Sequence, residues 1–222
     1  FGVWGVNVKV NQMTAGTTAA GTPAKIDWDS FIEDVDSLPV PDLDVDNALD
    51  IYAEGSVALD AFGILIAKGS FSLSIGQVSG TDTSGEGTTT LVDAQATVVK
   101  LGTTAFDGAL AAEVFVGIGG ELSDTTDGVD NGTPDAYADD EILTDSGLGF
   151  YASLDALTLV LLKDPGADPV ATTDDISYMG LELDDLSAKL LGIDGLTFGV
   201  WGVNVKVNQM TAGTTAAGTP AK

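Results

Sequence analysis

The first 25 residues of the chain, FGVWGVNVKVNQMTAGTTAAGTPAK, return without a single change as residues 198–222. An identical copy at a spacing of 197 residues means that the fold must accept the same segment near both of its ends. Self-similarity at a fixed period is typical of repeat architectures, in which each unit continues into the next. We therefore expect residues 1–197 to form one full β-rich repeat and residues 198–222 to begin another. The alternative is an artificial duplication of a terminal strand.

The charge balance and the missing residue types narrow the classes of function. All eight basic residues are lysines, and 34 acidic residues give a net charge of −26, with no histidine and no cysteine. Nucleic acid needs basic contacts that release counterions, so we expect no nucleic-acid partner. The chain also lacks the commonest general base, the thiol nucleophile and the guanidinium clamp of enzymes. We therefore predict that it is not an enzyme.

The same composition bears on where the protein works. No apolar run approaches the roughly 20 residues of a membrane helix, so no membrane span is predicted. The absence of cysteine fits a reducing cytosol or a bacterial surface protein without disulfides, and the acidic excess favours the second, because charge keeps a large repetitive object soluble. We expect an extracellular or cell-surface location.

Apolar residues recur at every second position along most of the chain. From Ile51 to Ile75 every odd residue is apolar or glycine, whereas the even positions carry most of the polar groups. A helix would scatter these odd residues around its circumference, so the pattern predicts one face of β-structure. If unbroken, the run would extend about 80 Å. Gly55, Gly63 and Gly69 are expected to mark bends or bulges within it.

Similar alternation recurs in residues 92–98, 110–122 and 148–156. After 148–156 the apolar residues Leu157, Leu159 and Leu161 change parity, which suggests a strand that is buried on both sides. Parity also changes across Asp184-Asp185, where a single bulge is expected. A short helix is the alternative for residues 181–191, and another short helix is expected in residues 27–36.

The duplicated segment supplies the candidate contacts between repeats. On an alternating strand its tryptophan and three valines are expected to share one side and to pack where one unit meets the next. In the two copies these residues are Trp4, Val6, Val8 and Val10, and Trp201, Val203, Val205 and Val207.

These patterns predict an all-β fold: an elongated rod of long, mainly antiparallel strands, either β-solenoid-like or built of stacked sandwich repeats. Separate sandwich domains joined by TAGTTAAGTPAK are the alternative. The unbroken face from residue 51 to residue 75 favours the continuous rod, because separate sandwiches would bring turn signals every 8–12 residues.

Two acidic stretches are candidate calcium sites. Calcium takes six to eight oxygen ligands, which alternating aspartates and tight glycine turns can supply. Neither stretch reproduces a complete EF-hand loop, so a solvated acidic loop remains the alternative for both. The candidate ligands are Asp124, Asp127, Asp130, Asn131 and Asp135 in the first stretch, and Asp42, Asp44 and Asp46 in the second.

Several phrases resemble the repeats of very large bacterial surface proteins, the haemagglutinin- or adhesin-like arrays of about 200-residue β-rich repeats. The phrases are LDIYAEGSVALDAFGILIAKGSFSLS (49–74), AAEVFVGIGGELSDTTDGVDNGTPDA (111–136), LGFYASLDALTLVLLKD (148–164) and ISYMGLELDDLSAKLLGIDGLTFGVWGVNVKVNQ (176–209). Together they cover most of the 197-residue unit. The resemblance implies secretion and a structural or adhesive role, and it supplies no catalytic residues.

Three functions follow as hypotheses. The first is a structural repeat of an extracellular fibre, tether or sheath, whose partners are neighbouring copies of the same repeat. The second is a stalk repeat of a calcium-dependent surface adhesin, for which surface glycans are further candidate partners. The third is a β-helical polysaccharide lyase or hydrolase, which needs two carboxylates that converge in a groove.

Overall fold

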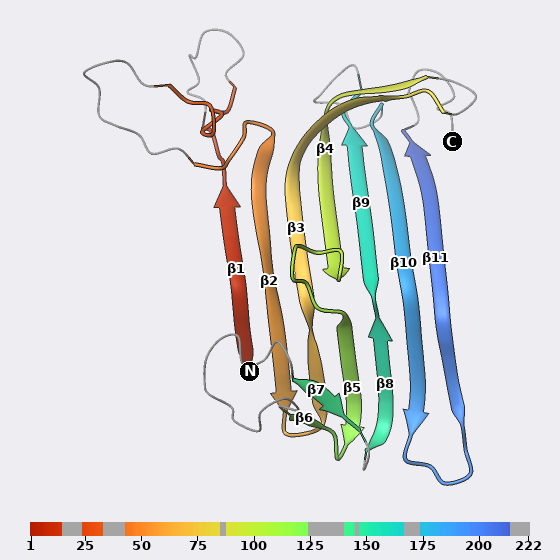
Figure 1. Ribbon diagram of the computed structural model, residues 1–222. Coiled ribbons are helices and arrows are strands. Elements are labelled where there is room, and N and C mark those ends of the chain that lie inside the picture. Colours follow the sequence, from red (N-terminus) through yellow and green to blue (C-terminus); the bar gives the residue numbers. More distant parts are fainter. Residues whose placement is uncertain are drawn as a thin grey trace.

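The computed structural model describes residues 1–14, 24–32, 43–84, 88–123, 140–144, 147–166 and 174–213, and the predicted all-β class is confirmed. The described residues form eleven strands and no helix (Figure 1). The strands are β1 (Gly2–Val10), β2 (Leu49–Ala61), β3 (Leu65–Asp82), β4 (Thr89–Gly102), β5 (Ala112–Ile118), β6 (Glu121–Ser123), β7 (Glu141–Leu143), β8 (Leu148–Leu154), β9 (Ala156–Asp164), β10 (Ile176–Leu191) and β11 (Phe198–Ala212).

Nine of these strands form one antiparallel sheet, and β6 and β7 form a separate pair. Strand β3 pairs with β5 near its start and with β4 further along, while β10 pairs first with β9 and then with β8. Strands β4 and β5 therefore lie end to end beside β3, and β9 and β8 lie end to end beside β10. We call each position across the sheet, filled by one strand or by two strands end to end, a lane. The resulting order of lanes is β1, β2, β3, β4 with β5, β9 with β8, β10, and β11. How successive repeats would stack into a rod, a solenoid or sandwiches stays a prediction.

The long alternating run of residues 51–75 is a hairpin rather than one unbroken strand, and the bend expected at Gly63 is a complete turn. At Gly55 and Gly69 the pairing of β2 with β3 shows no register shift. The chain turns at Phe62 and Gly63, both with positive φ, and the Ile64 amide donates to the Ala61 carbonyl at 3.0 Å. Two central residues with positive φ are the requirement of a type I′ turn. In the hairpin register Ile51 lies opposite Ile75, so odd residues face odd residues. The alternation therefore passes through the turn without a change of parity, which hid the turn in the sequence.

The register gives the sheet one apolar and one polar face. Because paired residues point to the same side, a row of partners can be followed across all seven lanes. One row, on what we name the apolar face, is Val8, Ala53, Leu73, Val99, Leu159, Leu181 and Val207. The adjacent row, on the polar face, is Asn7, Glu54, Ser72, Lys100, Thr158, Glu182 and Lys206.

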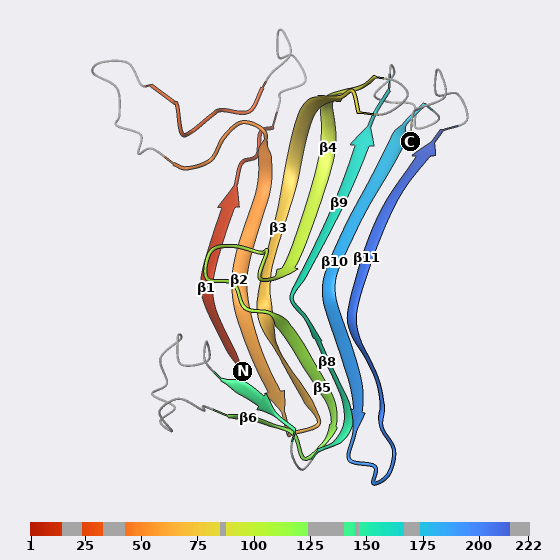
Figure 2. The same cartoon turned by 45° about the vertical axis from the view of Figure 1, so that its right-hand side comes forward.

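Irregular positions in neighbouring lanes keep the apolar residues on one face. The predicted bulge at Asp184-Asp185 is confirmed by a register shift and by the positive φ of Asp185, and residues 181–191 are strand rather than helix. Next to it the strand breaks at Asp155, whose amide donates to the Asp184 carbonyl at 3.2 Å. The strands bend near this level (Figure 2).

The break at Asp155 overturns the prediction that residues 148–161 form a strand buried on both sides. Leu157 pairs with Leu183, and Phe150 pairs with Leu190, which lies beyond the β10 bulge. Both pairs lie on the apolar face, because the parity changes in the two lanes at the same level. Tyr151 points to the polar face instead, beside Phe115.

A second bulge explains a further correction, since the tryptophan and the valines of the duplicated segment do not share one side. The register shifts between Trp4 and Asn7, and Gly5 has φ +61°. Two residues of β1 therefore lie opposite one residue of β2. In the second copy the corresponding glycine is Gly202, with φ +64°, and the register shifts at the same place. Both tryptophans lie on the polar face and the valines of both copies lie on the apolar face.

Several buried residues of the sheet lie on the polar face, under two covering segments. One segment is residues 103–111, where the Leu110 amide donates to Ser70 Oγ at 2.8 Å and Ser70 Oγ also bonds to Ser56 Oγ. The other is the β6–β7 pair, whose Ile142 packs with Ile66 and Phe115 in the main hydrophobic cluster. None of the buried hydrophobic residues among the described parts of the chain lies on the apolar face.

Two remaining expectations concern helices. Residues 27–32, the described part of the helix expected at 27–36, contain no helix, and the rest lies outside the described residues. The helical expectation is not met because Trp28 joins a local extended pairing instead, with its amide donating to the Val45 carbonyl at 2.9 Å. Among the residues that the structure describes, no helix is long and apolar enough to cross a membrane.

Candidate functional site: two identical edge strands

The two copies of the duplicated segment are the outermost strands of the sheet. β1 lies at one edge and β11 at the other, and the two strands run in the same direction (Figure 1). Each pairs with a single neighbour, β1 with β2 and β11 with β10. Among the residues that the structure describes, β1 and β11 therefore each have one edge in the ladder and one open edge.

The hydrogen-bond pattern shows which edge of each copy is used. At the end of β1 the Asn11 amide donates to the Asp50 carbonyl at 2.9 Å. Successive residues of a strand direct their backbone groups to opposite edges. Because the register from Asn7 to Val10 is regular, the amides of Asn7 and Lys9 point to β2, and those of Val8 and Val10 point to the open edge.

In β11 the assignment is reversed. The Gly213 amide donates to the Asp175 carbonyl at 2.8 Å, and the register with β10 is regular from Ala212 back to Val205. The amides of Val205 and Val207 therefore point to β10, and those of Lys206 and Asn208 point to the open edge. Val205 and Lys206 occupy the sequence positions of Val8 and Lys9. The edge that one copy uses is the edge that the other copy leaves open.

A single strand of this sequence can therefore pair with β10 on one side and with β2 on the other. The row that starts at Val8 ends at Val207, which has the sequence position of Val10. Continuation through the shared strand thus shifts the register by two residues per repeat. Because two is even, the apolar face would stay on the same side in the next repeat.

The side chains of the two copies have different partners. Lys9 Nζ lies 2.5 Å from Asp44 Oδ2 and 5.7 Å from the centre of the Tyr52 ring, whereas Lys206 Nζ lies 2.6 Å from Glu182 Oε1. The hydrogen bond to Glu182 raises the pKa of Lys206 above its ordinary value. In a continuous sheet one lysine would lie between a Glu182 of the preceding repeat and an Asp44 of the next.

Asn11 is the most specific side chain of the segment. It is 2% exposed, and its Nδ2 donates to the carbonyls of Ile26 at 2.8 Å and Asp46 at 2.7 Å. Its Oδ1 accepts a hydrogen bond from Trp28 Nε1 at 3.3 Å. These bonds attach Ile26, Trp28 and Asp46 to the end of β1. The matching residue of the second copy, Asn208, is exposed.

The predicted inter-repeat valines are mostly open to solvent. Val6, Val8 and Val10 are 58%, 60% and 54% exposed, and Val205 is 37% exposed. Val203 and Val207 are half-buried. Trp201 on the polar face is 59% exposed, and Trp4 is half-buried. Packing between repeats at these side chains stays a prediction.

The calcium candidates fall mostly outside the described residues. The candidates that lie outside are Asp42, Asp124, Asp127, Asp130, Asn131 and Asp135. Asp44 pairs with Lys9, and Asp46 Oδ1 accepts the amides of Ala48 and Leu49 at 2.8 and 2.9 Å. Within the described ranges no three acidic side chains form a metal-binding group.

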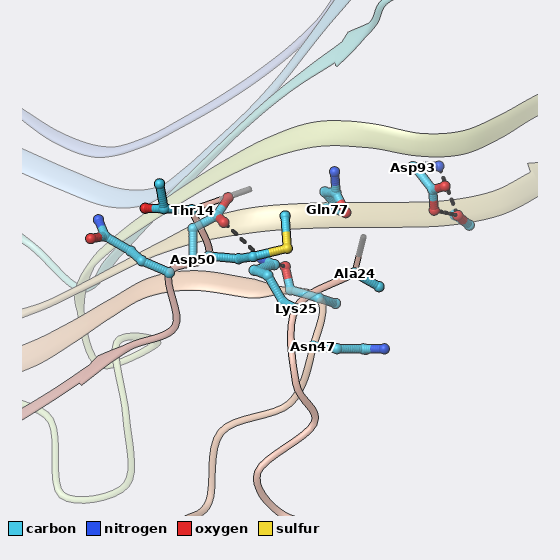
Figure 3. A pocket seen from close by; sticks show the side chains of 11 residues that line it. Thr14, Ala24, Lys25, Asn47, Asp50, Gln77 and Asp93 are labelled. Carbon is cyan, nitrogen blue, oxygen red and sulfur yellow. Dashed lines mark hydrogen bonds and ion pairs between the residues drawn. The ribbon is translucent and has the colours of Figure 1, made fainter. Parts of the chain in front are cut away.

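A polar groove of about 740 Å³ lies where residues 12–14 and 24–25 meet the ends of β2, β3 and β4 (Figure 3). Lys25 Nζ binds Asp50 Oδ1 at 2.7 Å and the Leu49 carbonyl at 2.7 Å. Asp93 Oδ1 accepts a hydrogen bond from Ser79 Oγ at 3.2 Å. The charged groups of this groove thus bind one another, the backbone or a neighbouring hydroxyl, and the contacts of Lys25 join the loop to the sheet.

No protein-family model, curated protein or solved structure matches this chain.

Proposed function

We propose that this chain is a structural repeat of an extracellular bacterial fibre, tether or sheath. The observation that carries the proposal is the pair of identical edge strands whose open edges are complementary. When repeats follow one another in one chain, β11 of one unit is also β1 of the next. The sheet then grows sideways by six lanes per repeat, which is about 29 Å at the usual spacing of strands. The resemblance to repeats of bacterial surface proteins supports the extracellular location.

The proposal is tested by chains that contain one, two and four repeats. Each added unit is residues 26–222, so that every junction carries the segment once. We expect the long dimension seen by small-angle X-ray scattering and electron microscopy to increase by about 29 Å per repeat. Folded units joined by flexible segments, with no fixed increment, would contradict the proposal. Antibody labelling of intact cells tests the location, and absence of surface label would contradict that part.

The alternative is a stalk repeat of a large calcium-dependent adhesin, which the same geometry supports. The two differ in where adhesion resides and in the native polypeptide. A single chain of many repeats with adhesive activity confined to its tip supports the stalk. Mass spectrometry of the intact polypeptide and tip labelling separate the two hypotheses.

Calcium binding belongs to the same proposal and predicts a thermal effect. If Asp124, Asp127, Asp130 and Asp135 or the stretch at Asp42 hold calcium, the ion stabilises the folded state by an amount that grows with the logarithm of its concentration relative to its dissociation constant. We expect a chelator to lower the melting temperature by several degrees at moderate salt, and added calcium to restore it. An unchanged melting curve would identify both stretches as solvated loops.

A further inference from the structure

The apolar face is the largest feature of the described sheet that no other part of the described chain covers. Thirteen of its large hydrophobic residues are classed as exposed, and the buried hydrophobic residues lie elsewhere. The exposed residues are Val3, Val6, Val8, Val10, Leu65, Val116, Ile118, Leu148, Phe150, Leu161, Phe198, Val200 and Val205. Seven lanes and about ten residues along the strands give the face an area on the order of 1,000 Å².

An apolar surface of this size indicates an interface. The largest apolar patch of a typical monomer is about 300–600 Å². A standard protein interface buries about 800 Å² on each partner, so the face is large enough for a stable complex. Two sheets that pack face to face lie about 10 Å apart and interdigitate their side chains.

Charge selects the kind of partner. Among the charged residues with a register partner in the described sheet, only Lys163 lies on the apolar face. Lys100, Glu182 and Lys206 and the other paired charges lie on the polar face. Two copies with a net charge of −26 each can therefore meet through this face without bringing acidic side chains together.

Continuity of the face points to a partner with the same period. Because the register shift across the shared strand is even, the apolar strip would run uninterrupted from one repeat into the next. A partner that covers every repeat equally must itself repeat at the same interval. A second copy of the same sheet meets this condition and carries the matching apolar surface.

We propose that the apolar face binds the apolar face of a second copy of this chain, so that the assembled structure is two sheets thick. The inference deepens the proposed function and rests on it for the continuity of the strip. The dimer itself can be tested on the single 222-residue chain.

The test uses two adjacent valines of β4, the central lane. Val99 points to the apolar face and Val98 to the polar face, and both are half-buried. We expect the unchanged chain to sediment as a dimer at micromolar concentration. Val99→Glu should raise the dissociation constant of the dimer at least tenfold, whereas Val98→Glu should leave it within about threefold of the value for the unchanged chain. Circular dichroism checks that both variants keep the β-sheet spectrum.

A second pair of variants does not depend on tolerance of a buried charge. The chain has no cysteine, so Val99→Cys and Val98→Cys each introduce a single thiol. Under mild oxidation or with a short bifunctional thiol reagent, Val99→Cys should give a covalent dimer and Val98→Cys should not. Equal cross-linking of the two variants, or a monomeric unchanged chain, would overturn the proposal. Flotation of the monomer with neutral phosphatidylcholine vesicles would identify lipid as the occupant and also overturn it.

The outcome is separable from that of the proposed function. In a two-repeat chain, Val99→Glu in both units should halve the mass per length without changing the increment in length per repeat. If the increment is absent while dimers form, the edge-strand proposal fails and the face proposal stands. If the increment is present and dimers never form, the reverse holds.

Discussion

At the scale of single residues, the duplicated segment shows how one sequence acquires two environments. Asn11 is buried and bonded to Ile26, Trp28 and Asp46, whereas Asn208 is exposed, although their flanking sequences are identical from ten residues before to fourteen after. The difference arises because β1 is followed by the segment that folds over its end.

This difference predicts unequal effects of one substitution. Asn11→Ala removes the donor of two part-buried hydrogen bonds, to the carbonyls of Ile26 and Asp46, so it should reduce the free energy of unfolding by about 1–3 kcal/mol. Asn208→Ala at an exposed position should change it by less than about 0.5 kcal/mol. Urea unfolding of both variants measures the difference. Equal effects would mean that the contacts of Asn11 do not stabilise the fold.

Two tyrosines predict the response to alkaline pH. Burial, and then the hydrogen bond and charge of a neighbouring glutamate, raise the pKa of Tyr52 and of Tyr151 from 10.0 to about 12; the glutamates are Glu54 and Glu113. The folded state holds these protons more firmly than the unfolded state, so their contribution is complete below pH 10 and is lost as the pH rises towards 12. Chemical unfolding across this range should show falling stability.

Tyr151→Phe should reduce this loss of stability, and Tyr52→Phe provides an independent comparison. Ultraviolet absorbance of tyrosinate in the folded chain follows the titration directly. Tyrosines that all titrate at their ordinary pKa while the chain remains folded would contradict the assignment.

At the scale of strands, the edge assignment predicts opposite results for one substitution in the two copies. Val10 and Val207 occupy the same position of the segment, but the Val10 amide points to the open edge and the Val207 amide points to β10. Proline removes this amide hydrogen, which matters only where it is bonded. Val207→Pro should destabilise the chain by at least about 1 kcal/mol, whereas Val10→Pro should be tolerated.

Thermal melting of the two proline variants compares them directly, and Val10→Ala and Val207→Ala control for loss of the side chain. If Val10→Pro is as destabilising as Val207→Pro, the two copies use the same edge and the complementarity is wrong.

Most of the strands were predictable from the sequence. The errors arose at local irregularities, where the chain turns or bulges. Period-two alternation identified β-structure because side chains of a strand alternate between faces. It did not show that the bend expected at Gly63 is a complete turn, since an odd-to-odd register keeps parity through a turn. It also failed at Gly5, where a bulge moves Trp4 to the other face. At Asp184-Asp185 the change of parity was visible, so that bulge was predicted correctly.

At the scale of the whole molecule, the sequence revealed the edge strands and the apolar face only in part. The identical segments pointed to repetition, but only the pairing showed that they lie at opposite edges with reversed hydrogen-bonding parity. The alternating apolar residues of the apolar face were visible in the sequence. The sequence did not show that the described chain leaves this face uncovered, because burial depends on what packs against a sheet. Asn11 carries no local signal, since its partners lie 15 or more residues away.

The central claim is that one strand of this sequence joins two repeats through both of its edges. Amide hydrogen exchange on the single chain and on a two-repeat chain, in which residues 26–222 follow residue 222, measures this directly. In the single chain the amides of Val205 and Val207 should be protected while those of Lys206 and Asn208 exchange rapidly. In the two-repeat chain all four amides at the junction should be protected. Rapid exchange of Lys206 and Asn208 at that junction would contradict the account.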